Sequence, residues 1–219
     1  MSFEDLTRTR FSCRHYEERP VEDSVLAHVI EAGRIAPSAC NNHPTRIKVC
    51  TSKDDLARAA LSCPRFERDG SIFGAPAVII ACAETERAWV RKYDQMNSSE
   101  IDTSIVVDQM MMAATEQGLG TCWVCAFDPQ VIQEKFNLPA GLRPISMLPL
   151  GYPAESIAAP ESREARCISL EDFTLYQKTA QHIHAERHQR QVIYTRAVKA
   201  QLSIIGRRSF SQLNGKTDQ

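Results

Sequence analysis

The chain has 219 residues, a net charge of −1 and 43% hydrophobic residues, enough to bury the core of one large domain or two small ones. No apolar run approaches the roughly 20 residues of a membrane span, and the N-terminus lacks the basic and apolar regions of a signal peptide. We therefore expect a cytoplasmic protein with no membrane partner.

The charge is unevenly distributed along the chain. Residues 1–174 carry 18 basic and 25 acidic residues, a net charge of −7, whereas residues 175–219 carry 8 basic and 2 acidic residues, a net charge of +6. We interpret this as a domain over 1–174 followed by a basic helical arm over 175–219, attracted to an acidic body. The arm lacks the interleaved aromatic residues that stack on bases, so no nucleic-acid partner is expected.

Eight cysteines are scattered along the chain, most of them within apolar segments such as 81–83. This distribution suits buried, reduced thiols in a cytosol better than a disulfide framework.

The first elements in chain order are a short helix over 3–8 and an alternating segment, Arg10-Phe11-Ser12-Cys13-Arg14. In an extended backbone Arg10, Ser12 and Arg14 point the same way. Two guanidinium groups and a hydroxyl on one face suit a phosphate and a polyol chain. A solvated basic loop is the alternative that these residues alone leave open.

Residues 21–36 have the periodicity of an amphipathic helix, which Pro37 ends. The next stretch, residues 37–44, is rich in Pro, Ser and Asn, which predicts a turn with backbone donors and side-chain amides. An ordinary connection between a helix and a strand would have the same composition.

The middle of the chain alternates between predicted helices and strands. Helix 104–117 has no Pro or Gly and is apolar on most of its circumference, which predicts a buried helix. Asp128-Pro129 is typical of a helix start. The other predicted helices lie near 53–61 and 129–136, and the predicted strands near 46–51, 77–83, 121–127 and 145–150.

Cys122-Trp123-Val124-Cys125 has the spacing of a redox pair or of half a metal site. Against a redox pair, a strand at this position would point Cys122 and Cys125 to opposite faces. Against a metal site, no other cysteine pair exists to complete four ligands. We therefore predict no metal.

Three motifs together carry a resemblance to a known family: Gly118-Leu119-Gly120-Thr121-Cys122-Trp123, then Phe127-Asp128, then Leu148-Pro149-Leu150-Gly151-Tyr152-Pro153. With the two N-terminal motifs, this pattern resembles the nitroreductase family of FMN-dependent oxidoreductases over roughly residues 5–173. The resemblance implies an α+β fold, with a central mixed β-sheet flanked by helices and here a C-terminal helical extension. It also implies a homodimer with two FMN sites at the interface.

The resemblance further implies a set of cofactor-binding residues. Side chains of the first N-terminal motif, residues 10–14, would contact the FMN phosphate, ribityl chain and flavin ring. The second N-terminal motif, residues 37–44, would line the flavin. His43 and Thr45 depart from the Gln and Trp of the family pattern, and Glu161 from its Lys. The implied FMN-binding residues are Arg10, Ser12, Arg14, Pro37, Ser38, Ala39, Asn41, His43, Cys125, Ala126 and Arg163.

The implied activity is hydride transfer from NADH or NADPH to FMN N5, followed in ping-pong fashion by reduction of a nitroaromatic, a quinone or a related small oxidant. Backbone amides around Cys125 and Ala126 would approach N5. No side chain is expected to act as acid or base, so no catalytic residue is named. The alternatives are a specialised relative (a dehalogenase, an azoline dehydrogenase or a flavin-cleaving enzyme) and a flavin-binding protein without turnover.

Overall fold

The computed structural model describes residues 2–154 and 167–174. The chain divides into two compact units, residues 1–160 and 161–219, each of which is described by itself. The predicted basic arm over 175–219 and the predicted cofactor residue Arg163 lie outside the described residues. The predicted boundary at residue 174 therefore stays a prediction.

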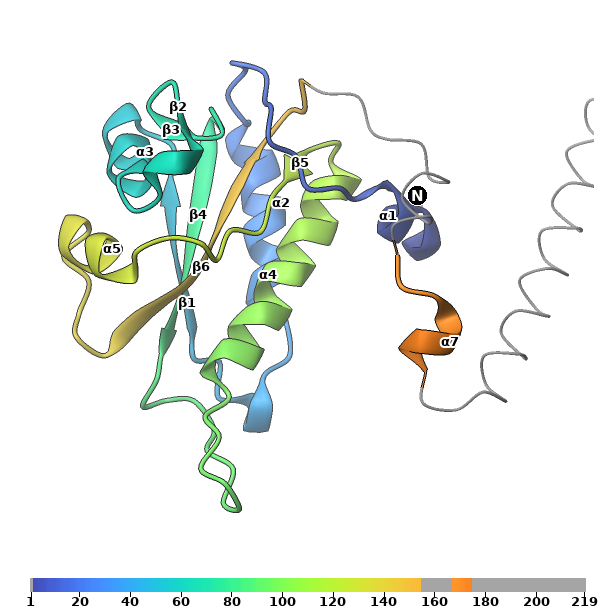
Figure 1. Ribbon diagram of the computed structural model, residues 1–219, viewed down its shortest axis with the longest axis vertical. Coiled ribbons are helices and arrows are strands. Elements are labelled where there is room, and N and C mark those ends of the chain that lie inside the picture. The colour runs from blue at the N-terminus through green and yellow to red at the C-terminus, as the bar shows by residue number, and fades with distance from the viewer. Residues whose placement is uncertain (1, 155–166, 175–219) are drawn as a thin grey trace, which may run out of the picture. The chain divides into compact units, whose positions relative to one another are not determined.

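The first unit is built on a four-stranded sheet with the order β1-β4-β6-β5 (Figure 1). Its strands are β1 (Thr45–Cys50), β4 (Ala77–Glu84), β6 (Leu142–Gly151) and β5 (Gly120–Thr121). All three strand pairings are antiparallel. Within the described residues a parallel pairing occurs in one isolated bridge, between Ser12 and Thr121. The predicted α+β class is confirmed. The sheet combines parallel and antiparallel pairing, as predicted, only through that isolated bridge.

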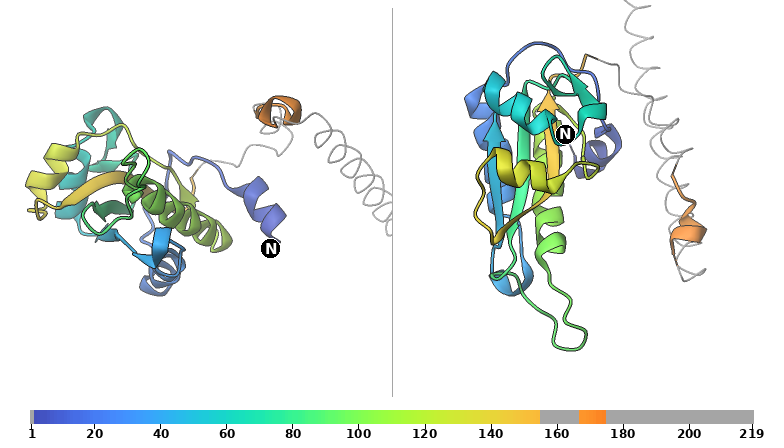
Figure 2. Two further views of the ribbon diagram at one scale, coloured as in Figure 1. Left: turned by 90° about the horizontal axis from the view of Figure 1, so that it is seen from below. Right: turned by 60° about the vertical axis from the view of Figure 1, so that its left-hand side comes forward.

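Helices cover both faces of this sheet (Figure 2). On one face lie α2 (Asp23–Arg34) and α4 (Ser99–Glu116), and on the other lie α3 (Lys53–Ala60) and α5 (Pro129–Lys135). The predicted start of α5 is confirmed, because the Asp128 side chain accepts a hydrogen bond from the Gln130 backbone N–H at 2.9 Å.

Strand β4 lies in the middle because it is apolar along almost its whole length. Ala77, Ile79 and Ala81 pack in the cluster with α2 and α4, while Val78 and Ile80 pack in the cluster with α3 and α5. This alternation follows from the two-residue repeat of a strand. Because both faces are covered, the sequence of β4 is a continuous apolar run rather than an alternating one.

Several shorter elements lie outside the sheet and its four covering helices. The residues after α3 form a hairpin with Asp69 and Gly70 at its turn, both with positive φ, which is the Asp-Gly signature of a tight β-hairpin. The remaining elements are α1 (Phe3–Thr9), η1 (Ala39–Asn41), η2 (Pro64–Phe66), β2 (Glu67–Arg68), β3 (Ser71–Ile72) and, in the second unit, α7 (Leu170–Phe173).

The predicted strand over 121–127 is wrong beyond Thr121. After β5 the chain makes one isolated bridge to β6, between Val124 and Met147. The Cys122 N–H donates to the Pro149 carbonyl at 3.2 Å, but Pro149 has no N–H with which to return the bond. A proline in β6 therefore interrupts the ladder at this position.

Helix α4 confirms the predicted helix over 104–117 and begins five residues earlier. Its burial is one-sided: Val107, Met110 and Ala114 are buried, whereas Ile101 is 51% exposed. In the part of the chain that the structure describes, no helix is long and apolar enough to cross a membrane.

All eight cysteines are thiols rather than disulfides, and five of them are buried. Burial raises the pKa of both Cys50 and Cys82 to about 12. These two thiols are therefore protonated and unreactive at neutral pH. The prediction that most cysteines are buried is confirmed, and their reduced state stays a prediction.

Candidate functional site

The segment of residues 10–17, called the N-terminal segment below, is extended and lies against the sheet. The Cys13 N–H donates to the Thr121 carbonyl, and the Glu17 N–H donates to the Tyr152 carbonyl, both at 2.9 Å. Cys13 is fully buried between two exposed residues, Ser12 and Arg14. The extended geometry predicted from the alternating sequence is therefore present.

Arg68, which the sequence analysis did not single out, joins the N-terminal segment from the β2–β3 hairpin. Its guanidinium lies 2.8 Å from His15 Nδ1 and donates to the Arg14 carbonyl at 3.3 Å. The hairpin thus brings a guanidinium to the backbone of the N-terminal segment at Arg14 and His15. The Asp69-Gly70 turn could have predicted the hairpin from the sequence. Nothing in the sequence indicates that the hairpin contacts the N-terminal segment.

Residues 37–43, called the flavin-edge loop below after the role that the family resemblance implies for them, have an unusual backbone. Cys40, Asn41 and His43 adopt φ angles of 51°, 58° and 46°, a left-handed conformation that costs a residue with a Cβ about 1–2 kcal/mol. Side chains hold it in place: Ser38 Oγ accepts from the His43 N–H at 2.9 Å, and His43 Nε2 lies 2.8 Å from Asn41 Oδ1. Such strain persists where the surroundings enforce it, typically in binding segments.

The N-terminal segment and the flavin-edge loop lie at opposite ends of α4 (Figure 1). Ser12 pairs with Thr121, just beyond the end of α4, whereas the Ala39 N–H donates to the Asp102 side chain near its start. Fourteen residues of helix separate Asp102 from Glu116, which is about 21 Å. Within one chain, the structure does not bring together the two motifs predicted to hold FMN.

Cys125 and Ala126 follow the Val124 bridge and are both exposed. The chain then turns into α5, where the Asp128 N–H donates to the Ser62 carbonyl at 2.7 Å. Cys122 is buried while Cys125 is exposed. The strand on which the argument against a Cys122–Cys125 redox pair rested is absent, but the two thiols still lie in different environments.

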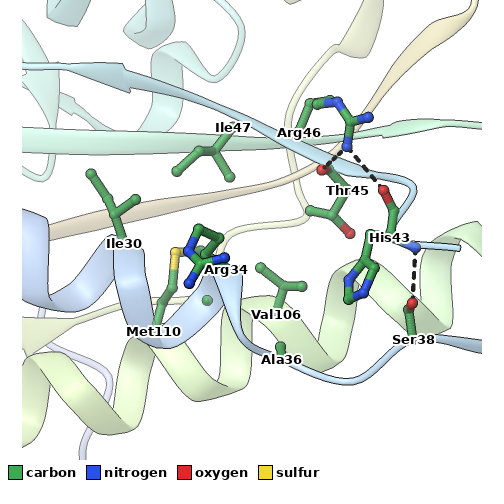
Figure 3. A pocket seen from close by; sticks show the side chains of 11 residues that line it. Ile30, Arg34, Ala36, Ser38, His43, Thr45, Arg46, Ile47, Val106 and Met110 are labelled. Carbon is green, nitrogen blue, oxygen red and sulfur yellow. Dashed lines mark hydrogen bonds between the residues drawn. The ribbon is translucent and has the colours of Figure 1, made fainter. Parts of the chain in front are cut away.

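A cavity of about 480 Å³ opens between α2, β1 and α4 (Figure 3). Ile30, Ile47, Val106 and Met110 make most of its wall apolar. It reaches the predicted cofactor residues only at Ser38 and His43, which lie at one end of it. The N-terminal segment, Cys125 and Ala126 are not part of its lining.

A broad apolar groove runs along the outer side of α4, between α1 and α2; it is called the outer groove below. The Gln109 Oε1 and Trp123 Nε1 atoms are buried beside it, and neither has a hydrogen-bond partner within the described residues. The apolar side chains that line this groove include those of Phe3, Ile35, Ile101, Ile105, Met112 and Trp123.

The chemistry of the N-terminal segment fits the phosphate end of FMN. Ser12 and Arg14 are exposed and Arg10 is half-buried, so a hydroxyl and guanidinium groups are accessible on one side of a fixed strand. Guanidinium forks and hydroxyls are suitable donors for phosphate oxygens. Within the described residues, no cluster of His, Cys, Asp and Glu could hold a metal ion.

Comparisons with known proteins agree with this geometry. Residues 7–152 match the model of the nitroreductase family. A putative NADH dehydrogenase/NAD(P)H nitroreductase of Methanothermobacter thermautotrophicus is 29% identical over 159 residues, which cover 68% of this chain and 76% of the relative. The FMN reductase [NAD(P)H] of Bacillus subtilis is 28% identical over 193 residues, covering 80% and 75%.

Among solved structures, a nitroreductase family protein from Clostridium difficile superimposes with a TM-score of 0.75 at 37% identity. The match covers 81% of this chain and 99% of that protein. The matched sequence spans the N-terminal segment, the flavin-edge loop and the Gly118–Gly151 stretch. The chain belongs to the nitroreductase family.

Proposed function

We propose that the protein is an FMN-dependent oxidoreductase that uses NADH or NADPH to reduce a nitroaromatic, a quinone or a related small oxidant. The observation that carries the proposal is the fixed, outward-facing arrangement of Ser12 and Arg14 beside Thr121, in a chain of the nitroreductase family. One curated relative is named an FMN reductase and another an NAD(P)H nitroreductase, which supports the choice of cofactor and donor.

In the proposed site, Arg10, Ser12 and Arg14 bind the phosphate and ribityl chain. Arg68 adds positive charge beside the Arg14 backbone. When bound, FMN supplies the hydride chemistry between the nicotinamide and the oxidant. The backbone amides of Cys125 and Ala126 hydrogen-bond the flavin edge, and a small side chain at position 126 permits that approach.

The proposed assembly is a homodimer, because each chain holds the two halves of the site at opposite ends of α4. A second copy seated on the outer groove would bring its flavin-edge loop, with Pro37, Ser38 and Asn41, to the N-terminal segment of the first. It would also cover exposed Ile101. An exposed apolar face suits a self-complementary interface.

The proposal is tested with the purified full-length chain. Released cofactor is identified by chromatography, and steady-state oxidation of NADH and of NADPH is followed with a quinone and with a nitroaromatic as oxidants. We expect FMN and turnover with at least one nicotinamide. FAD, or no flavin uptake, would exclude the proposed site, and flavin without turnover would indicate a binding protein instead.

A further inference from the structure

Asp102 is a buried carboxylate that the proposed chemistry does not use. It is 1% exposed and lies in the first turns of α4. Within the described residues it has no salt-bridge partner. Burying a carboxylate without a counter-ion is costly unless hydrogen bonds compensate, so its contacts indicate what it is there to hold.

Its two oxygens accept hydrogen bonds from two different loops. The Ala39 backbone N–H, in the flavin-edge loop, donates to Asp102 Oδ1 at 2.8 Å. The Ser98 hydroxyl donates to Oδ2 at 2.7 Å. Both bonds are short and buried, so one side chain ties both donors to the start of α4.

Ser98 ends the segment of residues 85–98 between β4 and α4, called the projecting loop below (Figure 1). The Ser98 side chain accepts from the Trp89 N–H at 3.1 Å, and its own N–H donates to the Trp89 carbonyl at 2.9 Å. The middle of the projecting loop carries Tyr93, which is 97% exposed. A chain of hydrogen bonds therefore runs from Asp102 through Ser98 to Trp89 in the projecting loop.

The two loops also touch directly. The Arg87 guanidinium, in the projecting loop, donates to the Asn42 carbonyl in the flavin-edge loop. This contact is exposed, so it contributes less than the buried bonds to Asp102. The flavin-edge loop also contains three left-handed residues, which would relax if its anchor at Ala39 were lost.

We propose that Asp102 is a positioning residue that fixes the flavin-edge loop and the projecting loop relative to each other, so that cofactor retention and oxidant binding depend on one buried carboxylate. The proposal rests on the proposed function. The Ala39 bond holds the loop on the cofactor side. The Ser98 bond holds the projecting loop, which contacts the flavin-edge loop through Arg87 and carries Trp89 and the exposed Tyr93. Because of that contact, the projecting loop is assigned to the oxidant side of the proposed site.

The test compares Asp102→Ala, Asp102→Asn and Ser98→Ala with Ser62→Ala in the full-length dimer. Ser62 is a matched control, because it is also buried and its hydroxyl donates to the Ala59 carbonyl at 2.7 Å. It lies just after the end of α3, away from both loops. Asn at position 102 keeps an acceptor for Ala39. Ser98→Ala removes both side-chain bonds of Ser98, to Asp102 and from the Trp89 N–H, and leaves the Ala39 bond in place.

For Asp102→Ala we expect the FMN dissociation constant and the oxidant KM each to rise by about tenfold or more, as loss of a bond to a charged group implies. Ser98→Ala should raise the oxidant KM and leave FMN affinity within twofold. Asp102→Asn should restore most of the FMN affinity. If Asp102→Ala melts earlier, like Ser62→Ala, but keeps both constants, its role is only structural and the proposal is wrong.

Hydrogen exchange separates this proposal from the proposed function, because it needs no cofactor. Asp102→Ala should speed amide exchange in residues 39–43 and in residues 86–97, Ser98→Ala only in the latter, and Ser62→Ala in neither. A wild-type protein that binds no flavin would overturn the proposed function while leaving this readout intact. Unchanged exchange in either loop of Asp102→Ala would overturn the positioning role.

Discussion

Gly120 lies against Cys13 so closely that no other residue fits: a Cβ added to Gly120 would be 2.6 Å from Cys13 Cβ and 2.7 Å from its Sγ. Real Cβ atoms essentially never approach so near. Gly120 is not among the residues with positive φ, so space rather than backbone conformation requires glycine here. The contact sets how the N-terminal segment sits on the sheet.

Gly120→Ala should therefore displace the N-terminal segment. We expect a loss of about 1–3 kcal/mol in the free energy of unfolding, the usual cost of overpacking, together with weaker FMN retention. Urea unfolding and fluorescence titration with FMN measure the two effects. Gly141→Ala is the control, because an added Cβ there has nothing within 4 Å; equal behaviour of the two variants would contradict the prediction.

Arg10→Ala should weaken FMN binding by about 1.5–3 kcal/mol, the scale of a hydrogen bond to a charged group. The fold should be unaffected, since Arg10 is only half-buried. Arg58→Ala, which removes a surface arginine paired with Asp54 on α3, is the control and should keep wild-type affinity. Equal FMN affinity in wild type and Arg10→Ala would remove Arg10 from the site.

Ile101→Glu should convert the protein to monomers that lose FMN. The substitution places a carboxylate in the outer groove, where the proposed second copy would bury it. Leu61→Glu alters a side chain of similar exposure, 54% against 51%, just after the end of α3, and should stay dimeric. Sedimentation velocity with absorbance in the flavin band measures both properties. A dimeric, flavin-loaded Ile101→Glu protein would place the interface elsewhere.

Glu22 should contribute to acid sensitivity. Hydrogen bonds from the Tyr152 hydroxyl and then from Arg19 lower the pKa of Glu22 from its usual 4.5 to about 2. Because the folded-state pKa lies below the unfolded one, the stabilisation is complete above about pH 4.5 and is lost as the pH falls toward 2. Melting temperatures between pH 5 and pH 3 should fall less steeply for Glu22→Gln than for wild type, and parallel curves would refute the assignment.

Much of the fold could be predicted from sequence because its strongest signals are local. The run from Ala77 to Ala83 could only be a covered strand, and Asp128-Pro129 could only start a helix. The segment after Thr121 was misjudged because its apolar residues look like a strand, whereas Pro149 on the neighbouring strand ends the pairing. A partner strand far away in sequence is invisible to a local pattern.

The site was harder to predict than the fold. The family motifs point to Arg10 and Ser38, but they do not show that these residues lie at opposite ends of one helix. Asp102 and Arg68 gave no signal, because a lone carboxylate in a helix and a lone arginine in a hairpin are usually surface residues. Their roles depend on which backbone groups the fold brings to them.

The placement of the two motifs at opposite ends of α4 has a consequence for mixed populations. In the proposed dimer, each site takes its N-terminal segment from one subunit and its flavin-edge loop from the other. A subunit with Arg10→Ala and a subunit with Asn41→Ala would each form defective dimers. Their heterodimer would contain one site with both substitutions and one with neither, so the isolated heterodimer should hold about one FMN, half the stoichiometry proposed for the wild type. Two variants that are each inactive alone would thus restore activity together, as intersubunit complementation.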